Sequence, residues 1–236
     1  DGSLITPYQI YGRAKGYPEL FYCEGSTISL KGSTTRKIAF ERTSKQHVRI
    51  SQNTVKDSVL VEKMLMNKQN FKSAKDVDGF VPQASGLYCI RIKNVHLLPE
   101  PFGTILLERG HDILYIGIAS ENLYNRFLNQ ELRAKGHGTF FRSMGAVLGY
   151  KPPKGSLIEK RNKKNYKFSK TDELKIIGWI NENLMVNWVE SAGDLDSLET
   201  SLIVKYLPLL NLSKNPAALQ ILSYLRKECV EIANRN

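Results

Sequence analysis

The sequence is short of cysteine, of long apolar runs and of acidic residues. Its three cysteines are Cys23, Cys89 and Cys229, an odd number spread far apart without a CxxC pair. They support neither a disulfide framework nor a zinc knuckle, and they favour a reducing compartment. No apolar run approaches the roughly 18 residues that a membrane-spanning helix needs. We therefore expect a cytoplasmic protein that makes no membrane contact.

The scarcity of acids leaves a net charge of +11, from 34 Lys and Arg against 23 Asp and Glu. Residues 126–170 hold twelve of the basic residues and only two acids, with aromatic residues interleaved. This mixture can pair with phosphates while its rings contact sugar or base, although charge alone also fits a solvated loop. We expect DNA as the partner, with RNA less favoured. The residues expected to contact nucleic acid are Lys135, His137, Arg142, Lys151, Lys154, Lys160, Arg161, Lys163, Lys164 and Lys167.

The pattern predicts two domains, residues 1–79 and residues 80–236. The first reads as a small β-rich N-terminal domain that binds DNA or a partner, and it ends in a helix over residues 55–67. Four short alternating runs separated by Gly, Ser and Thr predict its strands, at residues 21–23, 27–30, 37–40 and 48–50. The second domain contains a long basic loop over residues 151–170, because Pro and Gly interrupt this stretch.

In the second domain, residues 86–92 and 113–119 have the β-branched and aromatic composition of strands. Because successive side chains of a strand alternate faces, Tyr88 should share a face with Ile90 and Ile92, and Tyr115 with Gly117 and Ala119. A helix capped by Ser120 follows, with Arg126 in its first turns. The pattern then predicts further elements at residues 170–183 (a helix capped by Ser169), 185–190 (a strand), 195–207 and 217–233 (helices). We expect an α+β fold, a small central antiparallel sheet flanked by helices.

These elements carry an ordered series of residues. The series is Gly86-Leu87-Tyr88, then Tyr115-Ile116-Gly117, then Arg126, Glu199 and Asn211. In this order and context it resembles the GIY-YIG nuclease family, over roughly residues 85–215. Taken singly, the same residues fit ordinary roles: strand tyrosines pack in cores, and Glu199 could close a helix capping box with Asp196.

The resemblance implies a metal-dependent endonuclease and a role for each residue. Glu199 would bind Mg²⁺ or Mn²⁺, since Mg²⁺ takes one or two carboxylates and keeps several waters. Arg126 would hold the scissile phosphate. Tyr88 and Tyr115 would line one pocket, with one acting as general base or water positioner, and Asn211 would be a tether. A free phenol has a pKa of about 10, so Tyr88 could act as the base only where its phenolate is stabilised.

The chain departs from the family pattern at several places, of which Leu87 in place of Ile is a mild apolar exchange. The gap between Tyr88 and Tyr115 is longer than the usual hairpin, which implies an insertion. Ile118 stands where some members have Lys, and Gln130 stands where His or Tyr is usual. An auxiliary group would then come from elsewhere, and the candidates are Lys135, His137 and His111.

The sequence therefore predicts a Mg²⁺-dependent DNA endonuclease of the restriction or defence type, because a chain of this size must carry recognition and cleavage together. A structure-specific repair or recombination nuclease is the sibling alternative. Ile118 and Gln130 favour a third reading, a nuclease-like binding module that has lost turnover. A fourth is a β-rich interaction domain fused to a basic RNA binder. Symmetric cutting of a duplex would suggest a homodimer.

Overall fold

The computed structural model describes residues 21–24, 27–30 and 58–236. The chain divides into two compact units, Asp1–Arg49 and Ile50–Asn236. This division lies earlier in the chain than the boundary expected at residue 79. In the first unit, β1 (Phe21–Glu24) and β2 (Thr27–Leu30) pair as an antiparallel hairpin. Two of the predicted strands are thus confirmed, and the other two, at residues 37–40 and 48–50, lie outside the described residues.

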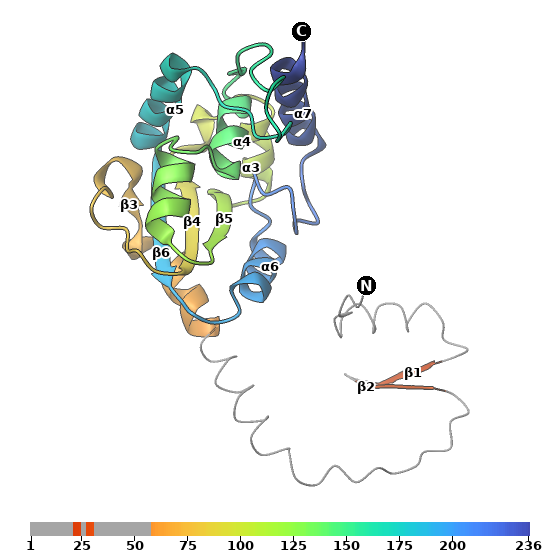
Figure 1. Cartoon of the computed structure of the whole chain (residues 1–236). Coiled ribbons are helices and arrows are strands. Elements are labelled where there is room, and N and C mark those ends of the chain that lie inside the picture. Colours follow the sequence, from red (N-terminus) through yellow and green to blue (C-terminus); the bar gives the residue numbers. More distant parts are fainter. Residues whose placement is uncertain (1–20, 25–26, 31–57) are drawn as a thin grey trace. The chain divides into compact units, whose positions relative to one another are not determined.

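The second unit is built on a four-stranded antiparallel sheet with the strand order β3-β6-β4-β5 (Figure 1). Its three long strands are β4 (Gly86–Ile92), β5 (Ile113–Ala119) and β6 (Leu184–Glu190), and the edge strand β3 is Lys72–Ser73. The predicted central antiparallel sheet and the α+β class are confirmed.

Both faces of this sheet are covered by helices. Tyr88, Ile90 and Ile92 point to one face, as predicted, whereas Leu87 and Cys89 point to the other. The second face packs on a helix at residues 58–66 and on α6 (Leu195–Tyr206). The Tyr88 face belongs to the larger core cluster, to which five helices contribute buried residues: α3 (Phe102–Glu108), η4 (Tyr124–Leu132), α4 (Thr139–Val147), α5 (Lys170–Asn183) and α7 (Gln220–Asn234).

Local sequence explains where several of these helices begin. The Ser169 hydroxyl accepts a hydrogen bond from the Asp172 N–H at 3.1 Å, which is the predicted cap of α5. The helix after β5 is capped by Asn122 instead of the predicted Ser120, since Asn122 Oδ1 accepts from the Asn125 N–H at 2.9 Å. Its following turns, η4, are a π-helix, a rare form with hydrogen bonds between residues five apart that is common at functional sites.

Two segments between the predicted elements are also ordered. The insertion between β4 and β5 folds into η3 (Val95–Leu97) and α3, and its Phe102 and Leu106 enter the core. Residues 151–169 contain no helix or strand, as expected, yet Leu157 is buried and its N–H donates to the Ala233 carbonyl at 2.7 Å. The basic loop is therefore packed against α7. In the described part of the chain, no helix has the length and apolar character needed to cross a membrane.

Candidate active site

Tyr88 and Tyr115 lie on neighbouring strands with their rings stacked, at a centroid distance of 6.2 Å. Gly117 is paired with Tyr88 across β4 and β5. A Cβ on Gly117 would lie 2.5 Å from Tyr88 Oη and 2.9 Å from the Tyr115 ring, closer than packed atoms allow. The glycine is therefore required here because it lets the two rings approach each other over the sheet.

Tyr88 is fully buried, and its hydroxyl donates a hydrogen bond to Glu131 Oε1 at 3.3 Å. Phe127 stacks on the same ring at 4.7 Å. Burial raises the pKa of Tyr88 well above its ordinary value, and the negative charge of Glu131 raises it further, while Arg126 opposes the rise. Tyr88 is thus held as a protonated phenol. This environment does not stabilise the phenolate that Tyr88 would need in order to act as a general base.

Arg126 lies on η4 beside these rings. Its Nη2 forms an ion pair with Glu131 Oε1 at 3.1 Å, and its Nη1 donates to Gln130 Oε1 at 3.0 Å. The side chain is 34% exposed, so the remaining N–H groups of the guanidinium face solvent. Burial lowers the pKa of Arg126, but the neighbouring Glu131 carboxylate raises it on balance, so the charge is permanent.

Glu131 joins these groups, although the sequence analysis did not select it. Its side chain has no exposed surface. The carboxylate lies at the start of α4, where Oε1 accepts from the Thr139 N–H and Oε2 from the Phe141 N–H, both at 3.2 Å. Burial raises the pKa of Glu131, and Arg126 and the backbone donors oppose that rise. One signal was visible: Glu131 is one of two acids in the strongly basic stretch 126–170.

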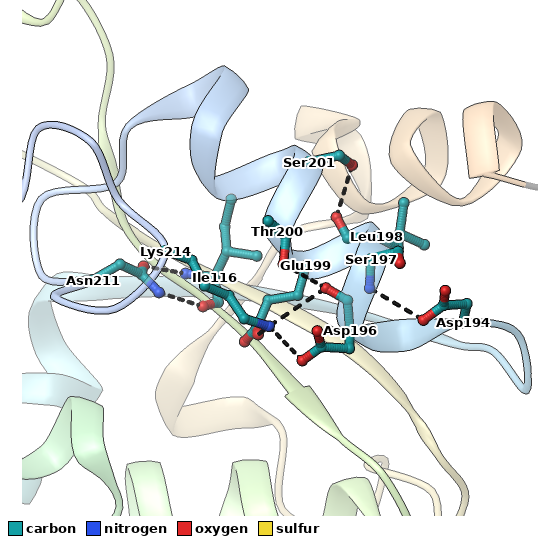
Figure 2. A network of polar contacts seen from close by, with 10 residues as sticks. All are labelled: Ile116, Asp194, Asp196, Ser197, Leu198, Glu199, Thr200, Ser201, Asn211 and Lys214. Atoms are coloured by element: carbon teal, nitrogen blue, oxygen red, sulfur yellow. Dashed lines mark hydrogen bonds and ion pairs between the residues drawn. The ribbon is translucent and has the colours of Figure 1, made fainter. Parts of the chain in front are cut away.

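Glu199 lies on α6 with its side chain 13% exposed and forms an ion pair with Lys214 Nζ at 2.7 Å (Figure 2). Lys214 also contacts Asp196 Oδ1 at 2.5 Å. The cap of α6 is Asp194, whose Oδ1 accepts from the Ser197 N–H at 3.1 Å, so Glu199 does not close a capping box. Its negative charge contributes, after burial and Glu131, to the raised pKa of both Tyr88 and Tyr115. Glu199 is thus electrostatically coupled to the tyrosines.

Asn211 is buried and binds both backbone groups of Ile116 in β5 (Figure 2). Its Oδ1 accepts from the Ile116 N–H at 3.0 Å and its Nδ2 donates to the Ile116 carbonyl at 2.8 Å. The neighbouring Leu210 N–H donates to the Leu114 carbonyl at 2.8 Å. Asn211 therefore ties the segment after α6 to the strand that carries Tyr115, and it does so three residues before Lys214.

A divalent ion fits the donor set around Glu199. Among the described residues there is no cluster of three or more His, Cys, Asp or Glu side chains. Glu199 Oε2 contacts Lys214, whereas no described residue donates a hydrogen bond to the other carboxylate oxygen. A single carboxylate of this kind suits Mg²⁺, which completes its shell with waters and substrate phosphate. The structure also adds Lys214, a cation that the sequence analysis did not associate with Glu199.

Two of the residues expected to contact nucleic acid are interior. His137 is 2% exposed and Arg142 is 9% exposed. His137 packs edge-on against Phe141 and its Nε2 accepts from the Phe168 N–H at 3.3 Å, while burial lowers its pKa to about 4. Arg142 lies near the Tyr166 ring. Both residues support the packing under the basic loop, so we correct the expectation that they lie on the nucleic-acid surface.

Two more of the expected residues are engaged in the fold. Lys151 forms an ion pair with Glu228 at 2.6 Å, and Lys163 donates to the carbonyls of Leu157 and Ile158. The other six are exposed and form no ion pair with any described residue; they are Lys135, Lys154, Lys160, Arg161, Lys164 and Lys167. Lys160, Arg161 and Lys167 also border a hollow of about 520 Å³ floored by Leu157 and Phe168.

The candidates for an auxiliary group fare differently. His111 is half-buried in the turn before β5, where its Nδ1 accepts from the Ile113 N–H at 3.2 Å. His137 is interior, and Lys135 is exposed without an ion pair among the described residues. Gln130, in contrast, contacts a residue of the site, because its Oε1 accepts a hydrogen bond from Arg126. The position that departs from the family pattern therefore still serves the arginine.

An antiparallel sheet with stacked tyrosines on adjacent strands, an arginine on the next helix and a carboxylate on a later one is an arrangement suited to phosphodiester chemistry. The family model of the GIY-YIG catalytic domain matches residues 86–228, and the chain belongs to this family. Its catalytic domain is therefore a nuclease domain, with nucleic acid as its class of substrate. Nucleases of this family generally depend on divalent metal ions. Comparisons with curated proteins and with solved structures give no match.

Proposed function

We propose that the protein is a Mg²⁺-dependent DNA endonuclease of the restriction or defence type, acting in the cytoplasm. The observation that supports this most is the stacking of Tyr88 and Tyr115 beside Arg126, with the partly exposed carboxylate of Glu199 on α6. Together these residues offer a carboxylate for the ion and a permanent cation for the phosphate. When bound, Mg²⁺ would stabilise charge on the phosphate and on the leaving oxygen.

The chain's own residues divide the remaining work. Arg126 keeps N–H groups free on its exposed side and is suited to hold the scissile phosphate. Tyr115 orients water or phosphate from the same pocket, and Tyr88 fixes the position of its neighbours, because its hydroxyl is already bound to Glu131. Asn211 acts as the tether that keeps the segment after α6 on β5.

DNA recognition is assigned to two regions. Six exposed basic residues grip the backbone, since they can pair with phosphates without breaking an ion pair to a described residue; they are Lys135, Lys154, Lys160, Arg161, Lys164 and Lys167. The N-terminal unit, Asp1–Arg49, carries DNA or partner binding. A homodimer would place two active sites on a duplex, one for each strand.

A second candidate function is a nucleic-acid-binding module without turnover. The observation that favours it is the ion pair between Lys214 and Glu199, because a permanent ammonium at the carboxylate opposes binding of a divalent ion. A structure-specific repair or recombination nuclease shares the chemistry of the first proposal and differs in its substrate.

The decisive experiment is digestion of plasmid DNA with Mg²⁺ or Mn²⁺, with and without EDTA, by the full chain and by Glu199→Gln. We expect cutting that EDTA abolishes, and we expect Glu199→Gln to bind DNA but to cut it at least about 100-fold more slowly. The matched control is Glu231→Gln, an exposed carboxylate on α7 whose loss should change nothing.

Each outcome separates the candidates. Discrete bands indicate restriction-type specificity, whereas preferential cutting of branched DNA indicates the repair or recombination enzyme. Binding without cutting under every divalent ion indicates the inactive module. Unchanged cutting by Glu199→Gln would show that the carboxylate is misassigned.

A further inference from the structure

Glu131 is a buried carboxylate that the proposed chemistry does not use. It is fully buried and still accepts hydrogen bonds from Tyr88, Thr139 and Phe141 as well as an ion pair from Arg126. Burying a charge is costly unless it is paired and hydrogen-bonded, and here those requirements are met. A group built in at this cost needs a role that an apolar side chain cannot perform.

The surroundings of Glu131 hold its carboxylate in one position. Both oxygens are bound to backbone N–H groups in the first turn of α4, so the carboxylate cannot turn without breaking one of them. Gly138 closes the other side, since a Cβ there would lie 1.9 Å from Glu131 Oε2. The carboxylate is therefore fixed to α4 even before Arg126 is considered.

Arg126 is gripped by two adjacent residues of its own helix. Glu131 holds Nη2 and Gln130 holds Nη1, at 3.1 and 3.0 Å. A free arginine side chain has many rotamers, and this freedom must be lost when it binds a phosphate. A guanidinium that is clamped beforehand has already lost much of this freedom, and its unused N–H groups remain on the exposed side.

We propose that Glu131, assisted by Gln130, is a positioning residue that clamps the Arg126 guanidinium for the scissile phosphate and links it to Tyr88 and α4. This inference rests on the proposed nuclease function and deepens it. Glu131 does not touch the substrate and acts only through Arg126 and Tyr88. The clamp also gives Gln130, which departs from the family pattern, a defined task.

The test is a double-mutant cycle of Glu131→Gln with Arg126→Ala, measured as kcat and KM on a duplex and as DNA affinity in EDTA. Glu131→Gln keeps the size and one acceptor but loses the charge. We expect kcat to fall about 100-fold, because small misplacement of a reacting group costs that much, while DNA affinity changes less than about threefold. Arg126→Ala should reduce kcat further, and the double variant should match Arg126→Ala alone.

The controls distinguish positioning from a merely structural role. Glu173→Gln alters a comparably buried carboxylate on α5, whose partners are His137 and Lys170, and kcat should not change. Gln130→Met releases only Nη1 and leaves the cap of α4 intact, so it tests the clamp even where Glu131→Gln fails to fold. We expect it to lower kcat about tenfold and to add nothing in the Arg126→Ala background.

Two results would overturn the clamp while leaving the nuclease in place. One is a double variant whose loss is the product of the two single losses, and the other is unchanged kcat in both Glu131→Gln and Gln130→Met. A wild-type chain that cuts no nucleic acid under any divalent ion would instead contradict the proposed function, and the clamp with it.

Discussion

The candidate active site has two halves that differ in how their polar groups are satisfied. In the buried half, Tyr88 and Glu131 have no exposed surface and are hydrogen-bonded to each other. Glu131 also binds Arg126 and the backbone at the start of α4. In the open half, Glu199 is held on one oxygen by Lys214, a partly exposed ammonium on the segment after Asn211. The carboxylate of the buried half is held by backbone N–H groups of α4, whereas the carboxylate of the open half is held by one lysine side chain.

The difference indicates a division between permanent and exchangeable interactions. Dipoles and charges that are fixed before the reaction stabilise developing charge without reorganisation, and the buried half meets that condition. An ion pair near solvent contributes little and can be exchanged, so Lys214 can give way to another cation. Glu199 thus has Lys214 as its counterion, while Arg126 is held by Glu131 and Gln130.

The largest predicted effect comes from disturbing the buried half with Gly117→Ala. The new methyl would overlap Tyr88 Oη and the Tyr115 ring, and overpacking of this kind costs about 1–3 kcal/mol. Because both rings must move, we expect cutting to fall at least about 100-fold and the melting temperature to drop by several degrees. Plasmid digestion and a thermal melt measure the two effects.

Its matched control is Gly178→Ala on α5, where an added Cβ would meet nothing within 4 Å. Alanine has the higher helix propensity, so this variant should be as stable as the wild type or more so, with full activity. Equal losses in Gly117→Ala and Gly178→Ala would mean that the close approach of the two tyrosine rings at Gly117 is not what limits activity.

Much of the fold followed from local pattern. Strand alternation correctly placed Tyr88 with Ile90 and Ile92, and the Ser169 cap and the long basic loop were also predicted correctly. The helix α4 was missed although its sequence is amphipathic, and its polar residues Arg142 and Ser143 are buried together with its apolar ones. The burial of these polar side chains is a consequence of tertiary packing, which composition does not reveal.

Parts of the site were also beyond the pattern. Lys214 meets Glu199 only because Asn211 ties the intervening segment to β5, a contact between distant parts of the chain. The position of the Glu131 carboxylate depends on the π-helical form of η4 and on the start of α4. The spacing of apolar residues in the sequence predicted neither of these features. His137 was expected on the surface because it lies in a basic stretch of the sequence, but it is interior. Counting charges along a sequence does not distinguish surface residues from core residues.

A smaller effect is expected in the open half from Lys214→Met. Removing the ammonium leaves Glu199 without its counterion, so Mn²⁺ should bind the free protein about fivefold more tightly, since a partly exposed ion pair is worth about 1 kcal/mol. Electron paramagnetic resonance of free Mn²⁺ measures this without any cleavage. Lys205→Met, which breaks an exposed ion pair on the same helix with Glu62, should leave the Mn²⁺ affinity unchanged. Equal affinities in wild type and Lys214→Met would show that the ammonium does not compete with the ion.

The smallest predicted effect is on the salt dependence of DNA affinity and comes from lysines of the basic loop. Some of these lysines are bound within the fold and others are not. Lys160 and Lys164 are exposed and form no ion pair with a described residue, whereas Lys163 is bound to loop carbonyls. Each lost phosphate contact lowers the slope of log affinity against log salt by about 0.9. Lys160→Gln and Lys164→Gln should each reduce the slope by that amount, measured by fluorescence anisotropy in EDTA.

Lys163→Gln is the control. It should destabilise the loop and leave the slope nearly unchanged, because its ammonium is already bound to loop carbonyls. If all three variants keep the wild-type slope, the loop is solvated and the grip on DNA lies elsewhere.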